Sequence, residues 1–264
     1  MFGKKKEMEE MTEREDGLID YNVYVMGTGE KAINIVFAAI VLFAVGYVFY
    51  HSIFLSALLM LLALKWPKIR TKQIIEKRKN QLTLQFKDML YSLSSALSVG
   101  KSVESGIEDA LKDLQVIYPD PQTEILLEME YILRGIGMNN TTESMFSQFA
   151  ERAHLEDIEN FVDIFVTCKR TGGDLIEVMR STSNTIGEKI EVKQEIETTI
   201  SGKKYEFNFM MVLPVIMVLF LTVTSREYME PVFTELAGKM AMTVAIIMFG
   251  LSYLVGSKLM KINV

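Results

Sequence analysis

Few residues of the chain could carry chemistry, and they do not form a recognisable active site. The sequence holds one cysteine, Cys168, and two histidines, His51 and His154. One cysteine allows no disulfide within the chain, and the three residues are too few for a metal site built on Cys and His. The spacing of His154 and Cys168 predicts no nucleophilic pair, and we expect His154 to lie on the surface.

Motifs of the common enzyme classes are also missing. The sequence has no Gly-rich loop ending in Lys-Ser/Thr, no His-Glu-x-x-His and no Gly-x-Ser-x-Gly, which excludes a P-loop nucleotidase and the hydrolases that depend on the other motifs. Four carboxylates close in sequence could hold a divalent cation, but helical carboxylates of this density usually form a solvated face. They are Glu156, Asp157, Glu159 and Asp163. We predict no catalytic residue, no cofactor, no metal ion and no enzymatic activity.

The apolar residues are gathered into three blocks. Of the 264 residues, 49% are hydrophobic, and Ala32–Leu64, Phe207–Ser225 and Met240–Gly256 contain no Asp, Glu, Lys or Arg. A helix needs roughly 20 apolar residues to cross the hydrocarbon core of a bilayer, so the blocks predict an integral membrane protein. Because they carry no ionisable residue for a proton relay or ion pathway, they argue against a pump or carrier.

The number of spans depends on the first block. Each of the two later blocks fits one membrane helix, with a tolerated kink at Pro214. Ala32–Leu64 would reach about 50 Å as one straight helix. A break near His51–Ser52 instead gives two short spans, the second extended by Trp66, a residue suited to the interface. We predict this hairpin, and hence four spans, with one long span as the alternative.

Basic residues around the blocks predict the orientation. Seven basic residues lie within 65–80, Lys203 and Lys204 precede the second block, and only Arg226 and Lys239 lie at the opposite ends. Because cytoplasmic flanks are enriched in Lys and Arg, we predict a multi-pass protein of the cytoplasmic (inner) membrane with both termini in the cytoplasm. No signal-peptide core or cleavage site follows the first residues, so the first span should be retained. The predicted order is a cytoplasmic N-terminal segment (1–31), a transmembrane hairpin (32–66), a cytoplasmic helical domain (67–206), a transmembrane helix (207–225), an extracytoplasmic loop (226–239), a last transmembrane helix (240–257) and a cytoplasmic tail (258–264).

The cytoplasmic domain is predicted to be all-α. Apolar residues recur three or four positions apart along most of it, as expected for helices with one buried face. One such face holds Leu82, Leu84, Phe86, Met89, Leu90, Leu93 and Leu97. Three turns combine glycine, which tolerates the positive φ that ends a helix, with a polar side chain that caps the next helix. The turns are Gly100 with Ser102, Gly135-Ile136-Gly137 with Asn140, and Gly172-Gly173 with Asp174. We predict a bundle of about six helices in two helix-hairpin-like halves.

Charge is distributed unevenly over this domain. Residues 81–200 contain 10 Lys and Arg against 21 Asp and Glu, a net charge of −11, whereas 65–80 contain seven basic residues and one acid. The basic segment suits anionic headgroups, so membrane lipids are expected partners. The net negative charge of residues 81–200 would repel nucleic acid. Their acidic surface is either a solvated face or a surface that docks a basic partner. Asp88, beside Lys87, is expected to face solvent.

Motifs in the helical domain resemble one known family. Residues 85–107, QFKDMLYSLSSALSVGKSVESGI, resemble the opening of the type II secretion F domain, with Phe86-Lys87-Asp88 where Leu-Pro-Asp is common. Residues 170–178, RTGGDLIEV, are similar to the family's Arg-x-Gly-Gly-x-Leu-x-Glu-Val turn.

The resemblance extends along nearly all of the chain after about residue 20. Phe149–Arg152 resembles the stretch before the turn, and residues 188–196 resemble the helix after it. Pro214, Tyr228–Pro231 and the last apolar block resemble the TadB-type subgroup of the tight-adherence pilus system. Related platforms of other systems commonly carry two copies of the domain, and the single copy here favours this subgroup.

The resemblance implies a platform protein of a type IV pilus-like machine. It implies three protein partners: a separate hexameric secretion ATPase, a homologous TadC-type platform protein, and the pilin that is lifted out of the membrane. A homo- or hetero-oligomer is expected. The competing interpretations are a membrane-anchored regulatory or interaction protein and a transporter or channel subunit.

One turn is the best candidate for a docking site. Paired glycines at a helix N-terminus permit close approach of a partner's backbone, yet the same residues could serve only to end one helix and start the next. We expect either docking or a structural turn for Gly100, Arg170, Gly172, Gly173, Asp174 and Glu177.

Overall fold

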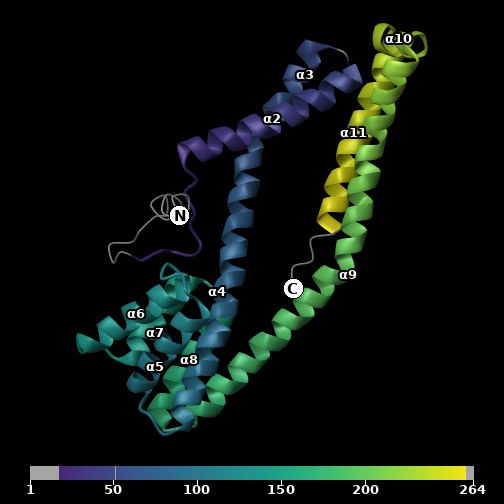
Figure 1. Cartoon of the computed structure of the whole chain (residues 1–264). Coiled ribbons are helices and arrows are strands. Elements are labelled where there is room, and N and C mark those ends of the chain that lie inside the picture. Colours follow the sequence, from purple (N-terminus) through teal and green to yellow (C-terminus); the bar gives the residue numbers. More distant parts are fainter. Residues whose placement is uncertain (1–17, 51, 260–264) are drawn as a thin grey trace. The chain divides into compact units, whose positions relative to one another are not determined.

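The chain folds as α-helices joined by short turns (Figure 1). The computed structural model describes residues 18–50 and 52–259. His51, at the predicted hairpin break, and residues 1–17 and 260–264 of the predicted termini lie outside the described residues. The all-α prediction is confirmed, because the described ranges contain no strand. The elements are α2 (Thr28–Tyr50), α3 (Ile53–Met60), the 3-10 helix η1 (Leu61–Lys65), α4 (Trp66–Ser98), α5 (Val103–Ile117), α6 (Glu124–Gly137), α7 (Thr142–Ala153), α8 (Glu156–Thr171), α9 (Leu175–Thr224), α10 (Arg226–Thr234) and α11 (Leu236–Leu259).

The helices form two compact units. The first, here called the helical domain, joins residues 18–27 with Arg70–Val192. The second, the apolar unit, joins the described residues of Thr28–Ile69 with residues 193–259. Helices α4 and α9 each contribute residues to both units.

Phenylalanines occupy the centre of the helical domain. The ring of Phe161 on α8 lies 5.4 Å from Phe86 on α4, 5.9 Å from Phe146 on α7 and 5.7 Å from Phe165, centroid to centroid. These distances are in the range of favourable aromatic pairs. The aromatic cluster thus joins helices that are far apart in the sequence.

The predicted buried face of α4 is confirmed except at one position. Leu82, Phe86 and Leu93 are fully buried, as are the face's other members apart from Leu97, which is nearly so. Leu84 is instead 39% exposed. Two positions from Leu82 on a helix with 3.6 residues per turn, its side chain lies on the opposite side.

Residues Leu18–Met26 contribute to the core of the helical domain, although the sequence predicted a separate N-terminal segment. Tyr21 is 1% exposed, and its backbone N–H donates to the Arg152 carbonyl at 3.1 Å. The Lys79 ammonium donates to the Asn22 side chain at 2.9 Å and to the His154 carbonyl at 3.0 Å. The segment just before α2 is therefore fixed to α4 and to the end of α7.

Two of the three predicted caps are confirmed. Ser102 accepts a hydrogen bond from the Ser105 N–H at the start of α5, and Asp174 accepts from Ile176 N and Glu177 N at the start of α9. The prediction for Asn140 was wrong. There the cap is Thr141, whose hydroxyl accepts from Ser144 N at 3.2 Å.

Gly135 and Gly137, which were predicted to form the turn, are still helical, so the chain turns after Gly137. Helix α6 continues through Gly137, and the positive φ of this turn is at Asn139, at 67°. Gly135 has a packing role, since a Cβ there would lie 2.4 Å from the Met145 sulfur.

The first apolar block is a helical hairpin. Helix α2 ends at Tyr50 and α3 begins at Ile53, and α3 and η1 fold back onto α2. The contact is close: a Cβ at Gly46 would lie 2.9 Å from a Leu59 methyl carbon and 3.0 Å from the Ser56 Cα. Small side chains, Ala38, Ala39 and Ala63, fill the interface.

Three helices in the described ranges are long and apolar enough to cross a membrane, which indicates a multi-pass membrane protein. They are α2, the apolar end of α9, and α11. The return arm of the hairpin is shorter, with eight residues in α3 and five in η1, so the predicted fourth span is not among them. The predicted extracytoplasmic loop contains a helix, α10, with Pro231 inside it.

Candidate docking surface

The six residues predicted as a docking site or structural turn are all exposed, and they lie in two turns. Gly100, between α4 and α5, has φ +88°, and Gly172, at the end of α8, has φ +74°. Side chains rarely adopt this left-handed conformation, so both glycines are required where the chain turns. Arg170, Gly173, Asp174 and Glu177 complete the second turn.

The two turns lie at the same end of the helical domain. Helix α4 runs toward this end and α9 starts from it (Figure 1). Lys169, at the end of α8, links three helices here: its ammonium lies 3.8 Å from Glu104 on α5 and 3.0 Å from Glu143 on α7, and it also donates to the Thr142 hydroxyl. The structure thus brings together the turns α4–α5, α6–α7 and α8–α9.

Glu143 is ionised over the whole neutral range. Burial raises the pKa of its carboxyl, but its own backbone N–H and the Lys169 ammonium outweigh burial and hold the pKa below its usual range. A lowered pKa in the folded state stabilises the fold above the pKa of the unfolded chain, and this stability is lost on acidification. The Lys169 contacts should therefore hold the three turns together at neutral pH.

Gly173 has a structural role beside any docking role. Its N–H donates to the Cys168 carbonyl at 2.9 Å, and a Cβ on it would lie 2.7 Å from the Cys168 sulfur. Because glycine has no side chain, the backbone of this turn can pack directly against Cys168 on α8. A substitution at Gly173 would therefore disturb the fold as well as any contact with a partner.

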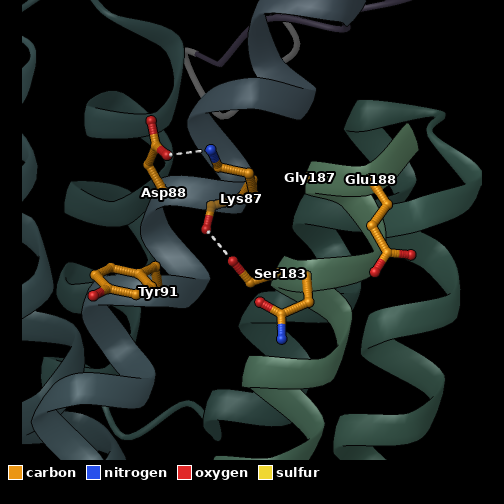
Figure 2. Close-up of a pocket in the computed structure, with 7 residues that line it drawn as sticks. Lys87, Asp88, Tyr91, Ser183, Gly187 and Glu188 are labelled. Carbon is orange, nitrogen blue, oxygen red and sulfur yellow. Dashed lines mark hydrogen bonds and ion pairs between the residues drawn. The ribbon is translucent and has the colours of Figure 1, made fainter. Parts of the chain in front are cut away.

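A groove lies between the first and last helices of the helical domain (Figure 2). Its volume is about 480 Å³. Its polar lining carries both charges, and it consists of Lys87, Asp88, Tyr91, Ser183, Asn184, Gly187 and Glu188.

The floor of the groove joins α4 to α9. The buried Ser183 hydroxyl donates to the Lys87 carbonyl at 3.1 Å. Gly187, one turn further along α9, leaves room for the Lys87 side chain, whose Cδ would lie 3.8 Å from a Cβ there. Tyr91 is 70% exposed on the rim. The groove could not be predicted from the sequence, because its residues come from segments far apart in the chain.

Asp88 is more constrained than the solvent-facing position expected for it. It accepts a hydrogen bond from the Tyr118 hydroxyl at 2.6 Å, and the Lys87 ammonium lies 3.2 Å away. Burial and the hydrogen bond to Asp88 raise the pKa of Tyr118 above its usual range, so the hydroxyl remains a donor. Asp88 therefore fixes the turn after α5 to α4, beside the groove.

A buried ion pair lies beneath the N-terminal segment. The Arg152 guanidinium donates to Glu128 through Nη2 at 2.5 Å and Nε at 3.2 Å, and both side chains are almost fully buried. The buried Tyr21 side chain lies beside the Glu128 carboxyl, and the Arg152 guanidinium lies over the Tyr131 ring, 4.9 Å from its centroid. Burial raises the pKa of the Glu128 carboxyl, with Arg152 opposing that effect. Removing one partner of such a pair would leave the other charge buried and uncompensated, which is strongly destabilising.

The sequence contains a signal for this buried pair. Glu128 interrupts the apolar pattern of Ile125, Met129 and Ile132, and Arg152 stands between buried positions of α7. A charge on an otherwise apolar helical face indicates a buried partner.

The remaining candidate residues have other partners. His154 lies 3.3 Å from Asp20, and Asp157 of the carboxylate cluster pairs with Lys189. Within residues 18–50 and 52–259, no group of three or more His, Cys, Asp or Glu side chains is placed to hold a metal ion.

Comparisons with known proteins leave the site to be interpreted from its own geometry. No family model, curated protein or solved structure matches the chain.

Proposed function

We propose that the chain is a platform protein of a type IV pilus-like machine, of the TadB type, in the cytoplasmic membrane. In this proposal the hairpin supplies two of four spans, and the helical domain faces the cytoplasm as two helix-hairpin-like halves. The chain would couple a separate hexameric ATPase to extraction of pilin, with a TadC-type partner platform. It performs no chemistry itself.

The observation that carries the proposal is the continuity of α9. One helix of 50 residues contains both core residues of the helical domain, such as Met179 and Ile186, and the apolar stretch from Phe207 to Thr224. A helix is stiff along its axis, because each turn is hydrogen-bonded to the next. Movement of the core could therefore be transmitted to the apolar stretch without an intervening loop.

The groove between α4 and α9 strengthens this argument. Both helices also contribute residues to the apolar unit. A ligand or partner held against Lys87 and Glu188 would contact the two helices that leave the domain. The exposed turns around Arg170 offer a second contact surface.

The proposal is tested by capture of partners from cells that express the full chain. Photo-crosslinking residues placed beside Arg170 should recover a hexameric ATPase, and deletion of the gene should abolish filaments. Recovery of a signalling protein with filaments intact would contradict the proposal and favour a regulatory function. Transport by the purified chain in liposomes would favour a transporter subunit.

A charge reversal separates docking from folding at the turn. Arg170→Glu changes an exposed side chain and leaves the Gly173–Cys168 contact intact, so the ATPase should be lost while helicity and melting stay unchanged. The matched control is Arg180→Glu, the same change at an exposed position of α9, which should retain the ATPase. Equal retention by both variants would exclude the turn as the docking site.

A further inference from the structure

A second cavity lies within the apolar unit, where α2, α9 and α10 meet. Its volume is about 570 Å³, within the ~300–1,000 Å³ of small-molecule sites. One part of its wall is apolar and the other is charged. It is lined by Tyr47, Val48, Leu219, Thr222, Val223, Arg226, Met229, Glu230, Phe233 and Thr234.

The position of this cavity along the helices corresponds to the depth of lipid headgroups. The cavity begins where the apolar stretch of α9 ends, at Thr224, and where α2 ends, at Tyr50. Tyrosines gather at this level: Tyr47 and Tyr50 on α2, and Tyr228 on α10. Tyrosine is enriched at both membrane–water interfaces, so these residues indicate the boundary of the hydrocarbon. A ligand in the cavity would have its polar part at the interface and its apolar part along α9.

The charged part of the wall presents one cation and one anion. Arg226 and Glu230 lie one turn apart on α10 and both line the cavity. They are close enough in sequence to pair, yet in the part of the chain that the structure describes neither side chain forms an ion pair or a side-chain hydrogen bond. Both charges are therefore available to a ligand.

The ligand that suits this wall carries a phosphate and a primary ammonium close together. Arginine binds phosphate through two parallel hydrogen bonds, and a carboxylate accepts hydrogen bonds from an ammonium. We propose that the cavity binds an ethanolamine phospholipid, with the phosphate on Arg226, the ammonium on Glu230 and the acyl chains along Leu219 and Val223. This inference requires only that α9 and α11 cross a bilayer, and it is independent of the pilus function.

Related headgroups should bind less well for separate reasons. A choline headgroup has the phosphate but no N–H to donate to Glu230. A glycerol headgroup has the phosphate but no cation, so Glu230 opposes it. The preference for ethanolamine therefore depends on Glu230, whereas retention of any phospholipid depends on Arg226.

The test uses the full chain, delipidated in mild detergent and then titrated with three phospholipids of identical acyl chains. Native mass spectrometry should show the ethanolamine lipid retained at about tenfold lower concentration than the choline or glycerol lipid, the effect of one charge-assisted hydrogen bond. Equal retention of all three lipids by the wild-type chain would overturn the proposal. Free phosphoethanolamine at the same concentration should not displace the lipid; displacement would overturn the assignment to a lipid.

Three variants distinguish this site from general lipid coating. Arg226→Gln should weaken retention of ethanolamine and glycerol lipids alike, with Arg226→Lys intermediate. Glu230→Gln should remove the preference for ethanolamine over glycerol. Glu227→Gln is the matched control, since Glu227 lies on the same helix but does not line the cavity, and it should retain the wild-type order. Unchanged retention in Arg226→Gln, or an unchanged lipid order in Glu230→Gln, would also overturn the proposal.

Discussion

The helical domain and the apolar unit use the same residue types in opposite ways. In the helical domain the apolar side chains of six helices meet in one buried cluster. Along the apolar stretch of α9 and along α11 no residue is buried, and side chains such as Phe220 and Ile247 are more than half exposed. Apolar surface of this extent is stable only against another apolar phase. The helical domain therefore holds itself together, whereas the apolar unit requires lipid or other subunits around it.

The largest expected effect comes from the same substitution made in each region. Phe161→Ala removes a fully buried ring that contacts Phe86, Phe146 and Phe165, and it should destabilise the helical domain by about 3–5 kcal/mol. Phe220→Ala, in the lipid-facing stretch, should change stability by less than ~0.5 kcal/mol. The measurement is labelling of Cys168, the chain's single thiol, against urea concentration in detergent. Equal effects would show that α9 is packed against protein.

The buried ion pair tests whether the domain depends on polar contacts as much as on its aromatic core. Arg152→Met leaves Glu128 buried without its partner and should cost about 3–5 kcal/mol near neutral pH. Arg180→Met, at an exposed position of α9, should cost less than ~0.5 kcal/mol. The double variant Arg152→Met with Glu128→Leu should recover most of the loss, because no charge remains buried.

The Arg152→Met variant should also acquire a pH dependence of defined sign. Burial already raises the pKa of Glu128, and Arg152 opposes that rise, so the variant's pKa should be higher still. A raised folded-state pKa means that the folded domain binds the proton more tightly than the unfolded chain, and stability falls as pH rises through it. The difference in stability between pH ~5 and pH ~8, in favour of pH ~5, should therefore be larger in the variant than in wild type. A flat profile would mean that water reaches Glu128.

The sequence predicted what depends on neighbouring residues. Helical periodicity identified the buried face of α4, and local cap chemistry identified Ser102 and Asp174. The errors were also local: Leu84 lies off its face, and Thr141 rather than Asn140 caps α7. In both cases the prediction was displaced by one or two residues. Such a displacement changes which way a side chain points or where a helix begins, but not whether the helix exists.

What the sequence did not predict depends on residues that are distant in the chain. Tyr21 meets Glu128 and Arg152, and Lys87 meets Ser183, only after the helices have packed. No local pattern contains such pairings. Helix α10 was also missed, and Met229 is its single buried residue. The candidate site could thus be predicted at its turns, but not at its groove.

The hairpin is a close-packed part of the apolar unit, and it should respond like the helical domain. Gly46→Val would force side-chain atoms into Leu59 and the Ser56 backbone, at a cost of ~1–3 kcal/mol. Cysteines introduced at Ala39 and Ala63, which share the buried cluster, should cross-link rapidly in a Cys168→Ser background and more slowly once Gly46→Val is added.

A control within the same helix distinguishes packing from a general effect of valine. A Cβ at Gly29 would meet nothing within 4 Å, so Gly29→Val should leave the cross-linking rate unchanged. If Gly46→Val also left the rate unchanged, the hairpin would not be held closed by this contact.

The smallest expected effects come from two glycines of the helical domain that differ only in backbone conformation. A Cβ would meet nothing within 4 Å at either Gly100 or Gly137, but Gly100 has φ +88° and Gly137 is helical. Gly100→Ala should therefore cost ~1–2 kcal/mol, whereas Gly137→Ala should be neutral or stabilise by up to ~1 kcal/mol. Cys168 labelling in urea measures both. Equal costs would mean that the Gly100 turn relaxes to accept a side chain.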